Sequence, residues 1–277
     1  MDRLFPGDDA VLLDGAMGTA LAAHGWPTER SPLLANLEAP GLVAAVHGAY
    51  REAGARLLLT NTFGALLPLG VPAAVRTGRP IDAVRAGVRI ARKVADGPQR
   101  GHGPVRVAGA LAACDLAAQG PRAEDVLKLF LDEGVDLLVF ETCNSARDAR
   151  CALDLRAEYA ARLPTVICVT STDGTHTDRK RVDESAALIA ADEQAVELGL
   201  NCCRGPNEAF KLALALPALP RWLKPNAGPP DAPVDDNVMA AFARAARQRG
   251  ARFLGGCCGT DAETLTVMAA ALETRTP

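Results

Sequence analysis

Eight short apolar runs alternate with longer amphipathic segments along this chain, and that alternation limits the possible folds more than any other feature. The runs predict strands at residues 11–14, 56–62, 105–110, 136–141, 165–170, 195–201, 221–225 and 252–256. Helical patterns accompany them at residues 39–53, 81–96, 124–133, 145–162, 183–193, 207–216, 234–250 and 261–274. Because near-continuous apolar runs suit parallel strands that helices cover, the pattern predicts an α/β protein.

Eight strand-then-helix units predict a (β/α)8 TIM barrel, in which the last strand lies beside the first. The main alternative is an open, doubly wound sheet, but the count of eight favours closure. A length of 277 residues is typical of one such barrel. No low-complexity linker divides the chain, and the Pro- and Gly-rich stretch 225–230 is typical of a loop. Residues 1–277 are therefore predicted to form a single domain.

The composition argues against several classes of partner and location. A net charge of −3 offers no electrostatic attraction to nucleic acid or to an anionic membrane. The N-terminal residues are charged and turn-prone, unlike a signal peptide, and no run of about 18 apolar residues occurs. We therefore expect a cytoplasmic protein whose eight cysteines are reduced thiols or metal ligands rather than disulfides.

Polar and thiol side chains follow six of the predicted strands, at the point where each strand ends. In a barrel all strand carboxyl ends open onto one face, where reactive residues are normally found. Residues that are scattered in the sequence should therefore converge there. The strand ends in question are Asp14-Gly15, Thr60-Asn61-Thr62, Glu141-Thr142, Asn201-Cys202, Lys224-Pro225-Asn226 and Gly256-Cys257-Cys258.

Three of these strand-end residues are cysteines, and they indicate a metal site. Cys257 and Cys258 are adjacent, so their Cα atoms lie only about 3.8 Å apart, below the lower limit of about 4.4 Å for an unstrained disulfide. A thiophilic metal shared by both, with Cys202 as a third ligand, is the better use, although three buried free cysteines are the alternative. Cys202 is favoured over Cys203 because it directly follows the strand end. Three thiolates leave one corner of a tetrahedral Zn²⁺ open to a thiol substrate.

The other strand-end residues allow more than one role. The Asp14-Gly15 turn either is a local Asx-type turn or exposes backbone N–H groups to an anionic ligand. Glu141 follows an apolar strand, so its carboxylate should face the barrel mouth and pair with a substrate ammonium, or else form a structural salt bridge. Thr62 either hydrogen-bonds a small polar ligand or caps the next segment. Asn226 is a ligand at the mouth or a turn residue.

Taken together, these strand ends resemble the homocysteine S-methyltransferase family, over essentially the whole chain. The GGCCGT element with an upstream Asn-Cys pair is the most specific part of the resemblance. The sequences of these motifs are most similar to the homocysteine-binding module of cobalamin-dependent methionine synthase. The matching motifs are LDGAMGT at 13–19, TNTF at 60–63, FET at 140–142, GLNC at 199–202, PNAG at 225–228 and GGCCGT at 255–260.

The resemblance implies a zinc-dependent barrel that transfers a methyl group to the thiol of homocysteine and gives methionine, an activity of class EC 2.1.1. It implies that Cys202, Cys257 and Cys258 hold the Zn²⁺ and that the homocysteine sulfur completes the coordination. No catalytic residue beyond this metal site is implied.

The resemblance also implies a substrate-binding set around the metal. The turn at Asp14 and Gly15 is implied to receive the amino-acid end of homocysteine, and Glu141 its ammonium group. Thr62 and Asn226 complete the expected set. Asn226 is also a candidate for the fourth metal position when homocysteine is absent.

The sequence does not specify the methyl donor. No second barrel for folate and no cobalamin domain follow within these residues, so the donor is a small molecule or comes from separately encoded folate or cobalamin proteins. S-methylmethionine, S-adenosylmethionine and betaine-like compounds are the small-molecule options. The alternatives to the main reading are a homocysteine-activating subunit of a split cobalamin-dependent methionine synthase and a methyltransferase for another thiol or a selenol. A non-catalytic zinc- or thiol-binding protein is a further alternative.

Overall fold

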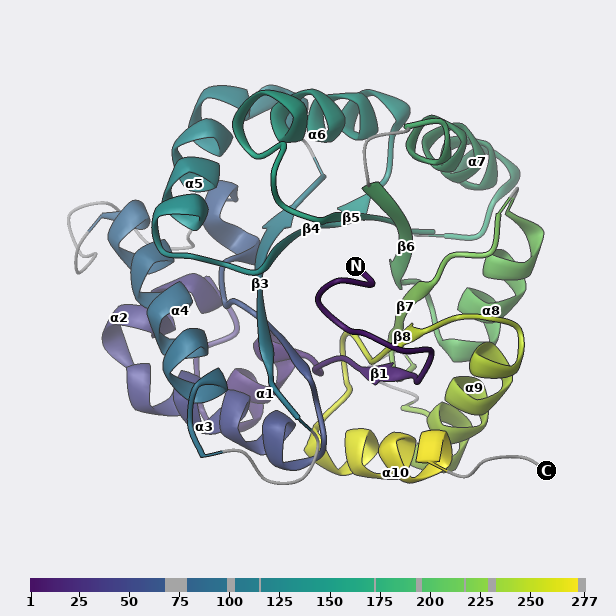
Figure 1. Ribbon diagram of the computed structural model, residues 1–277, viewed down its shortest axis with the longest axis horizontal. Coiled ribbons are helices and arrows are strands. Elements are labelled where there is room, and N and C mark those ends of the chain that lie inside the picture. The colour runs from purple at the N-terminus through teal and green to yellow at the C-terminus, as the bar shows by residue number, and fades with distance from the viewer. Residues whose placement is uncertain are drawn as a thin grey trace.

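Eight parallel strands form a ring in the computed structural model of the protein (Figure 1). The strands hydrogen-bond in the order β1-β8-β7-β6-β5-β4-β3-β2. A single bridge between Leu13 and Leu57 joins the two remaining edges, so the ring closes as a (β/α)8 barrel and the predicted fold is confirmed. The structure describes residues 1–67, 79–98, 103–114, 116–171, 173–192, 196–216, 218–228 and 233–273.

The elements agree with the predicted alternation in order and in type. The strands are β1 (Val11–Leu12), β2 (Leu57–Leu59), β3 (Arg106–Ala112), β4 (Leu137–Cys143), β5 (Thr165–Val169), β6 (Val196–Cys202), β7 (Trp222–Pro225) and β8 (Phe253–Leu254). The helices are α1 (Met17–Ala23), α2 (Ala35–Glu38), α3 (Pro40–Glu52), α4 (Pro80–Ala95), α5 (Gly120–Asp132), α6 (Ala146–Tyr159), α7 (His176–Ala190), α8 (Pro206–Ala215), α9 (Asp236–Gln248) and α10 (Ala262–Glu273). None of the described helices is long and apolar enough to cross a membrane.

The sequence pattern missed some helical turns. It did not predict α1 and α2, which are short and lie between β1 and α3. Helix α7 begins seven residues before the predicted start at 183, because Thr175 caps it: the Thr175 hydroxyl accepts a hydrogen bond from the backbone N–H of Asp178. The first turns of α7 are polar and show no apolar periodicity. Residues 193, 195 and 274, which the predicted elements included, lie outside the described part of the chain.

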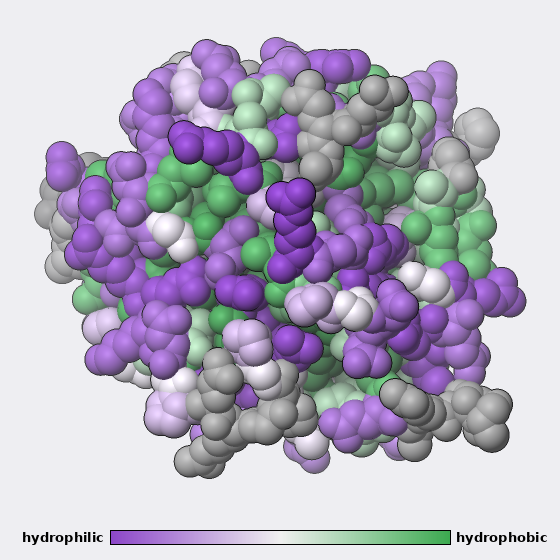
Figure 2. Space-filling model, viewed as in Figure 1, coloured by the Kyte–Doolittle hydropathy of each residue, from purple (hydrophilic) through white to green (hydrophobic). Residues whose placement is uncertain are grey.

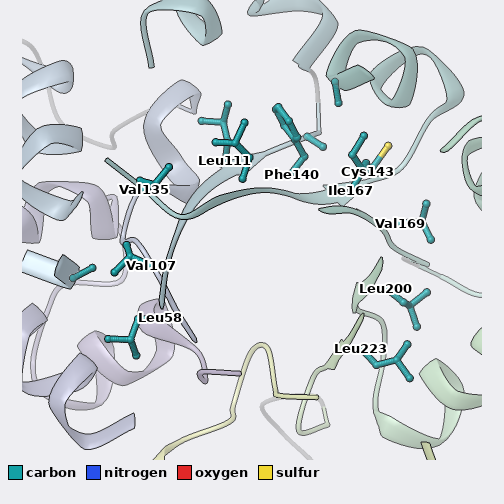
Figure 3. Packing of buried hydrophobic residues seen from close by; sticks show 14 of the residues in the cluster. Leu58, Val107, Leu111, Val135, Phe140, Cys143, Ile167, Val169, Leu200 and Leu223 are labelled. Atoms are coloured by element: carbon teal, nitrogen blue, oxygen red, sulfur yellow. The ribbon is translucent and has the colours of Figure 1, made fainter. Parts of the chain in front are cut away.

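The barrel has an inner and an outer apolar layer because successive side chains of a strand point to opposite faces. On β2, Leu57 and Leu59 point into the barrel, whereas Leu58 points outward. Figure 3 shows the outer layer, in which strand residues such as Leu58 and Phe140 point away from the ring toward the surrounding helices. The inner layer includes Trp222 and Phe253, whose ring centroids lie 5.9 Å apart.

The N-terminal segment closes the amino end of the barrel. It lies across the middle of the ring in Figure 1, and hydrophilic side chains cover most of the middle of this face in Figure 2. Phe5 is 1% exposed and packs edge-on against Phe253, with ring centroids 5.6 Å apart. Arg252 holds the segment in place: it donates hydrogen bonds to the carbonyls of Phe5 and Asp9 and to the Asp2 carboxylate. The opposite, carboxyl end remains available for a site.

Candidate functional site

A cavity of about 500 Å³ opens at the carboxyl ends of the strands. Its lining combines the ends of β1, β2, β4, β6, β7 and β8 with residues 28–32 and the segment after β2. Buried charged groups and thiols form the inner wall. The polar and thiol residues of that wall are Asp14, Thr60, Asn61, Glu141, Thr142, Asn201, Cys202, Lys224, Cys257 and Cys258.

Three thiols meet in this wall. The sulfur atoms of Cys202, Cys257 and Cys258 all lie within 4.8 Å of one another, and those of Cys202 and Cys257 are 3.1 Å apart. Among the described residues this is the sole cluster of three or more His, Cys, Asp or Glu side chains close enough to hold a metal ion. The structure thus brings together the three cysteines that the sequence singled out.

Backbone hydrogen bonds hold the thiol-bearing segments in place, with the end of β7 between them. The N–H of Asn226 donates to the carbonyl of Cys202, at 2.9 Å. On the other side, the N–H of Cys257 donates to the carbonyl of Pro225 at 2.7 Å, and the N–H of Ala227 to that of Cys258 at 2.9 Å. The Pro-Asn-Ala stretch therefore spaces Cys202 from the paired cysteines.

A left-handed backbone turn separates Cys202 from Cys203. Their φ angles are +56° and +59°, in a region that non-glycine residues rarely adopt. As a result the Cys202 thiol lies in the cavity wall, whereas Cys203 is buried and belongs to the outer apolar layer. The preference for Cys202 over Cys203 agrees with this geometry.

Two glycines let the first and last strand ends approach closely. A Cβ on Gly15 would lie 2.6 Å from the carbonyl oxygen of Thr260, and one on Gly256 would lie 2.1 Å from the Thr260 hydroxyl. The N–H of Ala16 donates to the same Thr260 carbonyl, at 3.0 Å. Any side chain at these two positions would force the strand ends apart and displace Cys257.

Glu141 faces the cavity by the strand period of two, because Leu137 and Val139 point inward, and a β-bulge follows it in β4. Phe140 pairs with Ile167 and Cys143 with Val169, so β4 has one residue more than β5 between these two pairs. Thr142, within the bulge, has φ +64°. Phe140 and Cys143 can therefore both face the outer layer, while Glu141 lines the cavity.

Glu141 is a buried carboxyl that forms no ion pair with any residue that the structure describes. It is 8% exposed, and the hydrogen bond to its side chain comes from Asn201 Nδ2, at 3.4 Å. Burial raises the pKa of Glu141 to about 7, although the charge of Lys224 acts in the opposite direction. A cationic ligand beside Glu141 would favour the charged carboxylate.

Asn201 links Glu141 to the thiol cluster. Its Oδ1 accepts a hydrogen bond from the Thr142 N–H at 2.9 Å, and its Nδ2 lies 3.7 Å from the Cys202 sulfur. The side chain is 1% exposed and joins the ends of β4 and β6. It therefore holds the carboxylate and the thiol at a fixed spacing.

Asp14 forms a buried ion pair with Lys224. Lys224 Nζ donates to Asp14 Oδ1 at 2.6 Å, and Asp14 Oδ2 accepts from the Leu59 N–H at 2.7 Å. Burial by itself would lower the pKa of Lys224, but the charges of Asp14, Glu141 and Cys257 raise it above its ordinary value. Lys224 is therefore a permanent cation in the wall, and both oxygens of Asp14 are already engaged.

Hydrogen bonds among the three thiols shift their pKa values in opposite directions. Hydrogen bonds from the thiols of Cys202 and Cys257 lower the pKa of Cys258 to about 3. The same contacts raise the pKa of Cys202, because it becomes the donor to its neighbours. A cation bound to the cluster could replace the protons that these thiols retain.

Two of the predicted substrate-binding residues do not line the cavity. Thr62 is fully buried, and its hydroxyl donates to the carbonyl of Ala110 at 2.7 Å. Thr60, two residues earlier, lines the cavity instead. Asn226 lies beside the cysteines through its backbone, and its Oδ1 is buried without a hydrogen-bond partner in the described structure.

Comparison with known proteins identifies the family. The model of the family described as homocysteine S-methyltransferase matches residues 11–272. The chain belongs to the homocysteine S-methyltransferase family. The match begins at β1 and ends within α10, so it includes all eight strands and every strand end that contributes to the cavity.

Relatives of two kinds are similar to this member of the family. Homocysteine S-methyltransferase of Escherichia coli (strain K12) is 30% identical over 91% of this chain and 92% of its own. Methionine synthase of Mycobacterium tuberculosis (strain ATCC 25618 / H37Rv) is also 30% identical, over 94% of this chain but only 24% of its own. The crystal structure of the homocysteine methyltransferase MmuM from Escherichia coli, in its metallated form, has a TM-score of 0.73 and 27% identity, covering 97% of this chain and 98% of that one.

Sequence reasoning missed two side chains of this homocysteine S-methyltransferase family site. Asn201 was noted only as the neighbour of Cys202, and Lys224 only as part of a strand end. The signal that could have found them is the strand period of two, since they follow the inward positions Gly199 and Trp222 by two residues. What the sequence could not show is that Lys224 at the end of β7 reaches Asp14 beyond the end of β1, past the intervening strand β8.

Proposed function

We propose that this protein transfers a methyl group to the thiol of homocysteine and releases methionine. The observation that carries the proposal is the cluster of Cys202, Cys257 and Cys258 in one cavity with the buried carboxyl of Glu141. A thiol-binding centre and an ammonium-binding carboxylate at the same barrel mouth suit a small amino acid with a sulfur at its far end. Membership of the homocysteine S-methyltransferase family supports this choice among thiols.

The three cysteines fit a zinc ion. Two thiolates bound to tetrahedral zinc at about 2.3 Å are about 3.8 Å apart, and the sulfur atoms here range from 3.1 Å to within 4.8 Å of one another. The unpartnered Oδ1 of Asn226 makes this residue a candidate for the fourth position in the absence of substrate. A bound zinc would lower the pKa of the substrate thiol, so that a thiolate is available near neutral pH.

The surrounding residues would orient the acceptor. The Glu141 carboxylate receives the ammonium group of homocysteine, and Asn201 fixes the spacing between Glu141 and the Cys202 sulfur. The backbone at Gly15 lines the same cavity, so it can approach the amino-acid end without a side chain intervening. In the transfer, the substrate sulfur attacks the methyl carbon in line, the new S–CH₃ bond forms, and the donor leaves with the electrons of the broken bond. Such orientation lowers the barrier by several kcal/mol.

The donor defines a second candidate function. The similarity to about a quarter of a methionine synthase favours a homocysteine-activating subunit that receives its methyl group from separate folate or cobalamin proteins. A small methylated donor, such as S-methylmethionine, S-adenosylmethionine or a betaine-like compound, would make the chain sufficient on its own. The same site could also serve a related thiol or a selenol acceptor.

The test is methionine formation by the purified, zinc-loaded protein. The donor panel should include the small methylated donors and methylcobalamin or methyltetrahydrofolate with partner proteins, and bound zinc should be measured on the same sample. We expect about one zinc per chain and methionine from homocysteine with at least one donor. Homocysteine binding without methionine from any donor would instead indicate a non-catalytic thiol-binding protein.

A further inference from the structure

The hydroxyl of Tyr50 contacts the strand ends of the site from outside the cavity. Tyr50 lies on α3, is 1% exposed and belongs to the outer apolar layer, and it does not line the cavity. Its hydroxyl donates to the carbonyl of Ala16 at 2.9 Å and lies 3.4 Å from the carbonyl oxygen of Thr260. One side chain of α3 therefore joins the segments that follow β1 and β8.

The Thr260 end of this contact belongs to the turn that carries two of the thiols. The N–H of Thr260 donates to the carbonyl of Cys257 at 3.0 Å, which closes the turn around Cys258. The N–H of Ala16 donates to the Thr260 carbonyl, also at 3.0 Å. The Thr260 carbonyl therefore connects Tyr50 and the β1 end with the turn of the paired cysteines.

The ring of Tyr50 leaves little freedom to the β1 end. A Cβ on Gly15 would lie 3.0 Å from two ring atoms of Tyr50, Cε1 and Cζ, so the ring packs directly against the Gly15 backbone. On the β8 side, the N–H of Gly256 donates to the Asp14 carbonyl at 3.3 Å. The phenol, the segment 14–16 and the cysteine turn are thus packed together, so the position of the phenol limits where the sulfur atoms of the turn can lie.

The hydroxyl of Tyr50 gives this contact a direction that an apolar ring would not. A buried hydroxyl costs free energy unless it is hydrogen-bonded, and its net gain over an apolar group is small. Burial and the negative charges of Asp14 and Asp261 raise the pKa of Tyr50 above its ordinary value, so the hydroxyl keeps its proton and remains a donor. A phenylalanine would fill the same space, but it would not hold the Ala16 and Thr260 carbonyls.

We propose that Tyr50 is a positioning residue for the thiol cluster. Its hydroxyl holds the turn of Cys257 and Cys258 against the β1 end, and so fixes these two sulfur atoms relative to Cys202 at the spacing that a metal ion needs. The proposal rests on the zinc-dependent function above and adds to it a residue outside the cavity. Because Tyr50 does not line the cavity, its effect should appear in metal affinity rather than in direct contact with a substrate.

The test is the zinc affinity of Tyr50→Phe, which removes a single oxygen atom. Zinc dissociation constants are measured by competition with a chromogenic chelator, and Co²⁺ replaces zinc for absorption spectra of the cobalt–thiolate bands. We expect about 10-fold weaker zinc binding and a shifted cobalt spectrum in Tyr50→Phe. The matched control is Tyr159→Phe at the end of α6, since Tyr159 is the other of the two tyrosines and its ring faces Lys128. It should match the wild type in both measurements.

An unchanged zinc affinity and cobalt spectrum in Tyr50→Phe, with only a lower urea midpoint of the zinc-free protein, would overturn the proposal and make Tyr50 a packing residue. If Tyr50→Phe does not fold, the wild type labelled with 3-fluorotyrosine replaces it, and Tyr159→Phe assigns the two ¹⁹F signals. Zinc should then shift the signal of Tyr50 and leave that of Tyr159 in place, and an unshifted Tyr50 signal would overturn the proposal.

Failure of the proposed function is a separate result. In that case the wild type binds zinc but forms no methionine with any donor, and the zinc affinities of the wild type and Tyr50→Phe still decide the role of Tyr50.

Discussion

The two ends of the barrel differ in the residues that occupy left-handed backbone positions. At the amino end, where helices lead back into strands, the left-handed positions are glycines, such as Gly54, Gly134 and Gly250. At the carboxyl end, left-handed glycines such as Gly228 and Gly259 are joined by Thr142, Cys202 and Cys203, for which this conformation costs of order 1 kcal/mol each. The amino end therefore uses residues that suit its geometry, whereas the carboxyl end keeps strained residues whose side chains are needed.

The buried charged groups at the two ends differ in the partners that they have. At the amino end, Arg252 is 5% exposed and donates to three separate acceptors from the N-terminal segment. At the carboxyl end, Glu141 has no ion-pair partner and Lys224 ion-pairs with Asp14 alone among the described residues, and three thiols lie within 4.8 Å of one another. The N-terminal segment fills the amino end, whereas the carboxyl end opens as a cavity of about 500 Å³ that can receive a ligand. This is the usual division between stability and activity in a barrel of this kind.

The largest expected effect is the loss of the thiol cluster. Cys202→Ala and Cys257→Ala should each lower the rate of methionine formation more than about 100-fold and abolish stoichiometric zinc, because a ligand is removed. The far-UV circular dichroism should stay that of the wild type, since neither side chain belongs to the two apolar layers of the barrel. Cys151→Ala, on the outer side in α6, is the control and should keep zinc and activity. Full turnover with stoichiometric zinc in either site variant would disprove the ligand assignment.

Glu141→Gln should chiefly raise the KM for homocysteine, by about 30-fold, because the ammonium would lose its buried carboxylate partner. The measurement is steady-state kinetics across homocysteine concentrations, with zinc content checked. Glu208→Gln, an exposed substitution on α8, should leave KM unchanged. An unaltered KM in Glu141→Gln would remove Glu141 from the substrate site.

Phe5→Ala tests the other end of the barrel. The side chain is 1% exposed against Phe253, so its removal should lower the free energy of unfolding by about 3 kcal/mol, measured by urea denaturation. Zinc content and the kcat/KM of the folded protein should stay within about twofold of wild type. A large loss of kcat/KM at full zinc occupancy would show that the two ends are coupled. It would disprove the division in which the amino end serves stability and the carboxyl end serves activity.

His47 is an exception to the contrast, because it is a buried unpaired group outside both ends. Neither ring nitrogen has a hydrogen-bond partner in the described structure, and burial lowers the pKa of His47 from 6.5 to about 4. Between pH 6.5 and pH 4 the unfolded chain binds a proton at His47 that the folded protein does not bind. The contribution of His47 to the free energy of unfolding is therefore fully present above pH 6.5. It is lost as the pH falls toward 4, by up to about 3 kcal/mol. Urea denaturation at several pH values should show that His47→Leu loses much of this acid-induced decrease. The same decrease in both proteins would assign it to other groups.

The smallest effect compares one left-handed residue from each end. Thr142 has φ +64° and Gly134 has φ +70°. Thr142→Gly should stabilise the protein by up to about 1 kcal/mol, and Gly134→Ala should destabilise it by about 1 kcal/mol, since nothing lies within 4 Å of the added Cβ and the cost is the backbone's alone. Urea midpoints measure both. If Thr142→Gly lowers the free energy of unfolding, the side-chain contacts of Thr142 stabilise the β4 bulge by more than its left-handed backbone costs.

Much of this protein could be predicted from the sequence, for reasons that are local. Apolar runs gave the strands and their order, because a parallel strand covered on both faces must be apolar along its length. The helices that were missed, α1 and α2, are too short for a periodic pattern, and α7 begins with polar turns. The positions of the candidate residues at strand ends followed from the same alternation.

What the sequence determined by itself is the order of the strands and which residues lie near their carboxyl ends, because both follow from local apolarity. Only the tertiary structure decided which of them meet, because contacts across a closed ring depend on register, bulges and close glycine approaches rather than on spacing. Lys224 pairs with Asp14 across 210 residues, and Cys202 approaches Cys257 across 55. Thr62, which the sequence offered as a substrate contact, instead donates to the backbone of β3.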